Sequence, residues 1–94
     1  MSKGKFDTLI HAPNRLQICA RLAVVAEIEF KTLTELLDVS DSVMSKQLKA
    51  LEEAGYVFLE KRPENGRQRT WLSLTKDGRT AFNGHVEALK EIVG

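Results

Sequence analysis

Apolar residues recur at helical spacing along the first quarter of the chain. Phe6, Leu9 and Ile10 form a short apolar stripe that Pro13 stops. The next helical side carries Leu16, Cys19, Leu22, Ala23 and Ala26. This periodicity predicts a helix over about 14–28, with Asn14 as its N-cap. The chain therefore begins with a short apolar segment followed by one amphipathic helix.

Two more helices are predicted before residue 56. Thr32 and Glu35 have the spacing of a capping box, and the residues after Thr32 place leucines on one side of a short helix. After the corner "DVS", Ser40 or Asp41 is suited to cap a second helix, and Gly55 is suited to end it. Two helices separated by about three residues are typical of a helix-turn-helix, here over about 32–54.

The apolar period changes from helical to alternating after Gly55. The residues "YVFLEKR" predict a strand over about 56–62, "PENG" predicts a turn, and "RTWLSL" predicts a returning strand over about 69–74. Thr75 then caps a last helix over about 76–93. These elements predict one α+β domain spanning 1–94, in the order α-α-α-α-β-β-α, with a hairpin over about 56–74.

Composition narrows the class of protein but not its partner. The chain has 94 residues and a net charge of +1, with 43% hydrophobic and 29% charged residues, as in ordinary globular domains. No apolar run approaches the roughly 18 residues of a membrane span, and the N-terminus is short and polar, so we expect a cytoplasmic protein. The single cysteine excludes an internal disulfide and a cysteine-rich metal cluster.

The helix that begins at Ser40 or Asp41 separates apolar from basic residues. On a helical wheel, Met44, Leu48 and Leu51 form one edge, and the opposite side carries Ser42, Ser45, Lys46 and Lys49. Hydroxyls and lysines suit contacts to base edges and phosphates in a DNA major groove. Taken alone, the same pattern also fits a solvated helix face.

A second basic element follows in the predicted hairpin. Its tip and base carry Arg62, Arg67, Gln68 and Arg69. A basic hairpin directly after a helix-turn-helix is suited to lie along a DNA backbone or in the minor groove. Arg15 is a further candidate for a phosphate contact or for a structural role. Two basic elements in this order favour DNA binding over a merely solvated surface.

Three stretches carry a resemblance to a known family: "TLTELLDVSDSVMSKQLKALEEAGYV", "EKRPENGRQRTWLSLT" and "LTKDGRTAF". Together they resemble winged-helix transcriptional regulators of the MarR/ArsR-like superfamily, especially its small single-domain members. The resemblance implies a homodimeric repressor that binds double-stranded DNA at a pseudo-palindromic operator. It also implies that the terminal segments form the dimer interface. Apolar residues suited to that interface are Phe6, Leu9, Ile10, Phe82, Val86, Leu89 and Val93.

Departures from the family pattern bear on metals and on the hairpin. The metal-sensing branch has a cysteine motif where this chain reads "ELLDVSDS", and the widely separated His11 and His85 are more typical of surface or interface positions, so we expect no metal and no cofactor. Asn65 replaces the aspartate that precedes the wing arginine in MarR proteins. No effector pocket can be read from the sequence.

Other chemistry has less support. Cys19 lies on the apolar side of its helix, which favours an inert thiol over a redox sensor, and Trp71 is expected to pack against the helices. The serines and Lys46 lack the spacing of a Ser-x-x-Lys nucleophile site, so we expect no enzyme. The main alternative to DNA binding is a winged helix that binds an acidic protein partner.

Overall fold

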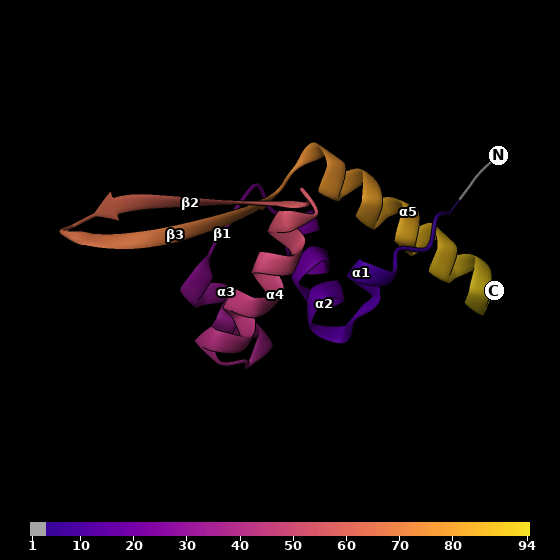
Figure 1. Ribbon diagram of the computed structural model, residues 1–94, viewed down its shortest axis with the longest axis horizontal. Coiled ribbons are helices and arrows are strands. Elements are labelled where there is room, and N and C mark those ends of the chain that lie inside the picture. The colour runs from indigo at the N-terminus through magenta and orange to yellow at the C-terminus, as the bar shows by residue number, and fades with distance from the viewer. Residues whose placement is uncertain (1–3) are drawn as a thin grey trace.

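The computed structural model describes residues 4–94 and has the predicted α+β architecture (Figure 1). A hairpin projects from one end of the molecule, and a long C-terminal helix extends from the other. The elements are α1 (Thr8–His11), α2 (Pro13–Ala23), β1 (Ile28–Glu29), α3 (Phe30–Leu37), α4 (Asp41–Glu53), β2 (Val57–Glu64), β3 (Arg67–Leu74) and α5 (Lys76–Val93).

The predicted helix over 14–28 is wrong at both ends. Pro13 occupies the first turn and Ala12 the N-cap position, because proline has no N–H to leave unpaired there. Asn14 is therefore inside α2. The helix ends at Ala23, and the β-branched pair Val24–Val25 follows it in non-helical backbone.

The residues beyond α2 form a strand that the helical pattern did not indicate. Ile28 and Glu29 pair with Leu72 and Trp71 in an antiparallel ladder. The sheet therefore has three strands in the order β1-β3-β2. A two-residue strand has no alternation of its own to detect, and only the pairing partner identifies it.

The helix-turn-helix begins earlier than expected and ends as expected. Glu29 is the N-cap of α3, without a side-chain hydrogen bond, so the predicted Thr32 capping box is not formed. Ser40 caps α4, where its Oγ accepts a hydrogen bond from the Val43 N–H at 3.1 Å. Gly55 follows α4 with φ of +82°, a left-handed conformation that glycine adopts without strain.

The hairpin, called the wing below, is longer and tighter than predicted. Its two strands reach Glu64 and Arg67, and Asn65 and Gly66 alone form the turn, both with positive φ. This is the two-residue turn whose twist matches paired strands. It fixes the register, so that Arg62 lies opposite Arg69.

The core lies between the helices and one face of the sheet. Its buried side chains come from α1, α2, α3, α4, β2 and β3, and include Leu22, Leu33, Leu48, Leu51 and Leu72, whereas α5 packs against it through partly buried residues. Cys19 is also buried, and burial raises the pKa of its thiol to about 12, which makes it a poor nucleophile. Ile10 is fully buried in this core, so it does not lie on any exposed interface.

The start of α5 packs closely on the base of the wing. The Thr75 Oγ accepts from the Gly78 N–H at 2.9 Å as the N-cap of α5, and it donates to the Gly55 carbonyl at 2.6 Å. A Cβ at Gly78 would overlap the Tyr56 carbonyl oxygen. Thr75 therefore joins the end of α4 to the start of α5 at the point where the wing leaves the body.

Candidate nucleic-acid interface

The exposed side of α4 carries the four residues proposed from the sequence. Ser42, Ser45, Lys46 and Lys49 are all exposed, and the opposite edge of the helix is buried through Met44, Leu48 and Leu51. Burying these three side chains contributes roughly 1.5–3 kcal/mol each. The apolar edge therefore fixes the rotation of α4, and the hydroxyls and ammonium groups face solvent together.

The charges on α4 are arranged along its length. Within residues 4–94, Lys46 and Lys49 take part in no ion pair. Glu52 and Glu53 lie at the C-terminal end of the helix, and Asp41 lies in its first turn, where a carboxylate interacts favourably with the helix dipole. The middle of the exposed face is thus positively charged and unpaired.

The wing differs, because two of its arginines are already paired. The Arg62 guanidinium donates to both carboxylate oxygens of Glu27, at 2.9 and 2.6 Å, and to Glu60 at 2.9 Å. Arg69 lies 2.8 Å from a Glu29 oxygen and 3.0 Å from Glu64. These paired residues lie on one face of the wing, called the outer face below.

The pKa values on the outer face reflect these pairs. The hydrogen bonds that Arg62 donates to Glu27 lower the pKa of the Glu27 carboxyl, and these bonds, with the one that Arg62 donates to Glu60, raise the pKa of Arg62. The Arg62 guanidinium also stacks over Trp71, 5.2 Å from the ring centroid. Trp71 is therefore on the sheet face opposite to Leu72, and the prediction that it packs against the helices is wrong.

The opposite face of the wing, called the inner face below, has a different composition. Val57, Leu72 and Leu74 on this face belong to the core, and the alternation of a strand continues the face outward through Lys61 and Pro63 of β2 and Gln68 and Thr70 of β3. Lys61 is exposed. Lys61 was not among the residues predicted from the sequence, because the three arginines of the hairpin give the stronger basic signal.

Arg67 and Gln68 are exposed at the tip of the wing, as expected for nucleic-acid contacts. They line a groove of about 220 Å³ between β3 and the start of α3, together with Lys31 and Thr70 among others. The groove lies beside the residues that lead into the helix-turn-helix. Side chains from the wing tip and from α3 are thus brought to one polar depression.

Arg15 has a structural role inside the chain. Its Nε donates to the Leu9 carbonyl, and its Nη1 donates to Gln47 of α4 at 2.8 Å. This guanidinium connects α1, α2 and α4. The alternative of a phosphate contact, left open by the sequence, therefore has less support than the structural one.

The N-terminal segment lies along α5, on the side of the molecule away from the wing (Figure 1). The Lys5 N–H donates to the Gly84 carbonyl at 2.9 Å, and the Asp7 N–H donates to Nδ1 of the buried His85 at 3.0 Å. Since His85 Nδ1 accepts this bond, the neutral ring carries its proton on Nε2, which lies 3.1 Å from Nδ1 of His11. The two histidines thus hold the segment against α5, and burial lowers the pKa of His85.

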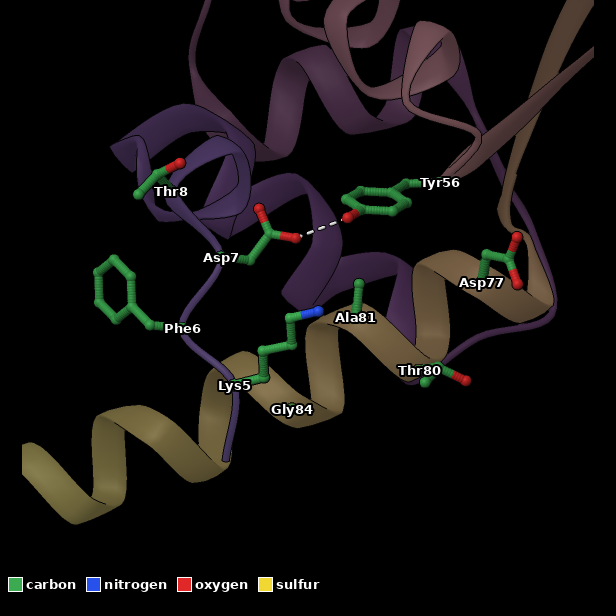
Figure 2. Close-up of a pocket in the computed structure, with 9 residues that line it drawn as sticks. All are labelled: Lys5, Phe6, Asp7, Thr8, Tyr56, Asp77, Thr80, Ala81 and Gly84. Atoms are coloured by element: carbon green, nitrogen blue, oxygen red, sulfur yellow. Dashed lines mark hydrogen bonds between the residues drawn. The ribbon is translucent and has the colours of Figure 1, made fainter. Parts of the chain in front are cut away.

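A cavity of about 620 Å³ opens beside this segment (Figure 2). Figure 2 shows Asp7 and Tyr56 pointing toward one another across it, and the Tyr56 hydroxyl donates to the Asp7 carboxylate at 2.6 Å. This bond raises the pKa of Tyr56 to about 12. Burial acts to raise the pKa of Asp7, but the bonds from Tyr56 and from the backbone of α1 outweigh it and lower that pKa.

The residues proposed for a dimer interface have unequal exposure. Phe6 is 41% and Val93 81% exposed, whereas Val86 and Leu89 are half-buried. Leu9 and Phe82 are partly buried and pack on the core. Ile92, 67% exposed, was not among the proposed residues. Within the two terminal segments, the exposed apolar side chains therefore lie at the end of α5 and at Phe6, rather than along the whole predicted seam.

A family model described as a winged helix DNA-binding domain matches residues 14–93. The chain belongs to this family. The match covers the helix-turn-helix, the wing and nearly all of α5, which confirms the winged-helix fold and the resemblance to winged-helix regulators. The exposed face of α4 and the wing are thus parts of a winged-helix DNA-binding domain.

Similar proteins come from several organisms. An uncharacterised protein of Methanocaldococcus jannaschii is 33% identical over 78 residues, covering 83% of this chain and 85% of the other. A transcriptional regulator homologue from Pyrococcus horikoshii has a TM-score of 0.86 at 24% identity, covering 90% of this winged-helix chain and 84% of that one. A transcriptional regulator of Thermotoga maritima has a TM-score of 0.72 at 22% identity, covering 87% of this chain and 57% of that one. The two solved structures share this fold.

Among the described residues, no helix of this winged-helix chain combines the length and apolar character needed to cross a membrane.

Proposed function

We propose that the protein is a homodimeric transcriptional regulator that binds double-stranded DNA in a sequence-specific manner and acts as a repressor. The observation that supports this most is the exposed side of α4, where Ser42, Ser45, Lys46 and Lys49 face solvent together. In a helix-turn-helix the second helix enters the major groove and presents its N-terminal residues to base edges. Arg67 and Gln68 at the wing tip supply a second contact.

The homodimer is supported by the apolar end of α5. Ile92 and Val93 are largely exposed, and Phe6 from the N-terminal segment is also exposed. A self-complementary contact between two copies would bury these side chains and place two α4 helices on one pseudo-palindromic operator. We expect a dimer by light scattering at micromolar concentration, and a monomer there would contradict the proposal.

Selection of bound duplexes from a random pool tests DNA binding directly. We expect an enriched sequence with two half-sites separated by about one helical turn of 10–10.5 base pairs. The affinity for that sequence should fall with salt on a log–log slope of several units. An enriched sequence without two-fold symmetry would argue against the dimer, and the absence of any enrichment would argue against specific DNA binding.

A double variant assigns the binding to the proposed surface. Lys46→Ala combined with Arg67→Ala should weaken binding and reduce the log–log salt slope by about two. Each substitution removes a cation that would neutralise one phosphate, so fewer counterions are released when the protein binds. Lys90→Ala combined with Lys76→Ala is the matched control, since both lysines lie on α5. Unchanged DNA binding in the first variant would contradict the proposal, and would favour a protein-binding winged helix if an acidic protein still bound.

A further inference from the structure

The two faces of the wing carry opposite balances of charge. The outer face holds the three arginines of the wing, Arg62, Arg67 and Arg69, together with four carboxylates, those of Glu27, Glu29, Glu60 and Glu64. Three cations against four anions leave this group of side chains with a net charge of −1. The net negative charge of this face disfavours a DNA phosphate, and Arg62 and Arg69 would have to leave their partners before either could bind one.

The outer-face pairs also connect the wing to the body of the protein. Glu27 and Glu29 come from the segment between α2 and α3, whereas Arg62 and Arg69 belong to β2 and β3. The Arg62–Glu27 contact is bidentate, a geometry that restricts the direction of both side chains. These contacts fix the direction in which the hairpin projects.

The inner face has no acid among its distal side chains. Beyond the core residues it presents Lys61 and Pro63 from β2 and Gln68 and Thr70 from β3. At its base this face packs on the helices, since β2 contacts α4 and β3 contacts α3. A duplex that contacts the exposed side of α4 therefore meets the inner face before the outer one.

We propose that the wing contacts DNA through its inner face, with Lys61 as a phosphate contact beside Gln68, and that Arg62 and Arg69 hold the wing in place instead of binding DNA. Arg67 lies opposite Glu64 on the outer face, but it is exposed next to the turn and forms no ion pair within residues 4–94, so it remains available to DNA at the tip of the wing. This inference rests on the proposed function, and it assigns a contact residue that lies outside the arginine cluster of the hairpin.

Cysteine protection distinguishes the two faces with neighbouring residues. Lys61→Cys places a thiol on the inner face and Glu60→Cys places one on the outer face, while the native Cys19 is buried. Each variant is treated with a maleimide, with and without a saturating amount of the selected operator duplex. We expect the duplex to slow modification at position 61 at least several-fold and to leave the rate at position 60 unchanged.

Salt titration provides an independent measurement. Lys61→Gln should reduce the log–log salt slope by about one, as expected for the loss of one phosphate contact. The charge-balanced variant Arg62→Gln with Glu27→Gln should keep the slope of the unmodified protein. Protection at position 60 but not 61, or a slope reduced by the paired variant and not by Lys61→Gln, would overturn the inference.

The two proposals can fail separately. If the unmodified protein binds no duplex in the selection, the proposed function fails and the inner-face contact fails with it. If the unmodified protein binds and the two thiols are equally protected or equally exposed, only the assignment of the inner face is overturned.

Discussion

Helix α4 and the wing both carry exposed basic residues, but the charges of these residues are in different states. On α4, Lys46 and Lys49 form no ion pair within residues 4–94, and a buried apolar edge holds the helix in place. On the wing, Arg62 and Arg69 are occupied by four carboxylates. The difference shows that the number of basic residues in an element overstates the positive charge available to DNA.

The largest expected effect tests how α4 is held. Leu48→Ala removes a fully buried side chain from the apolar edge and should lower the free energy of unfolding by about 2–5 kcal/mol, because the cavity cannot fully close. Urea denaturation followed by circular dichroism measures this. The matched control is Lys49→Ala, on the exposed side of the same helix, which should stay within about 0.5 kcal/mol of the unmodified protein. Equal losses of stability in the two variants would mean that the buried and exposed sides of α4 contribute equally to folding.

A smaller effect is expected where α4 and the wing meet α5. Thr75→Ala removes both the N-cap of α5 and the hydrogen bond to the Gly55 carbonyl, and should cost about 1–2 kcal/mol of stability. Thr75→Ser keeps the hydroxyl and should restore most of the loss. If the serine variant is as unstable as the alanine variant, the methyl group and its packing, rather than the two hydrogen bonds, account for the effect.

The cap of α4 should matter slightly less than that of α5. Ser40→Ala removes a single exposed hydrogen bond to the Val43 N–H and should cost about 1 kcal/mol in the same denaturation experiment. Ser40→Asp should preserve stability, since aspartate is an equally good N-cap. A loss larger than that of Thr75→Ala would show that the start of α4 depends on more than this one bond.

The smallest expected effect is a pH dependence of stability that does not change the charges on α4 or on the wing. The only histidines are His11 and His85, which lie outside α4 and the wing. Because burial lowers the folded-state pKa of His85, the unfolded chain binds more protons near pH 6, and stability is present above about 6.5 and lost as the pH falls below it. Denaturation midpoints at a series of pH values measure this loss.

The variant His85→Asn sharpens this measurement. The asparagine carbonyl can accept the Asp7 N–H in place of Nδ1, but it does not titrate. We expect the variant to show a flatter stability profile between about pH 5 and 7.5 than the unmodified protein. A profile as steep as before would assign the pH dependence to another group. The opposite slope, with stability rising as the pH falls, would contradict the neutral state of His85.

The arrangement of α4 could be predicted because it depends on local periodicity. Met44, Leu48 and Leu51 define its buried edge, and Ser40 and Gly55 mark its limits, all within one short stretch of sequence. The wing strands were also recognisable from their alternation. The predictions that failed concern features that depend on residues distant in the sequence. Strand β1 forms only because Ile28 pairs with Leu72, and α2 ends at Ala23, before the helical apolar pattern does.

The ion pairs of the wing could not be predicted for the same reason. Glu27 and Arg62 are 35 residues apart in sequence and form a bidentate pair, which no local pattern indicates. Trp71 was placed on the wrong side of its strand, although alternation with the apolar Leu72 separates the two faces. Lys61 could have been recognised from the same alternation, because it is two residues from the partly buried Leu59.

The two-residue turn at Asn65 and Gly66 gives the wing a parity. With two residues at the turn, even-numbered positions of β2 share a face with odd-numbered positions of β3, and every charge on the hairpin follows from that count. One residue inserted into β2 between Leu59 and Glu60 would move each later side chain of that strand to the other face. A lysine would then stand where an arginine stood. A single inserted codon would thus exchange the side chains that β2 places on the two faces of the wing while adding only one residue. Strand length, as much as residue identity, is therefore a variable through which such a domain can acquire a new target.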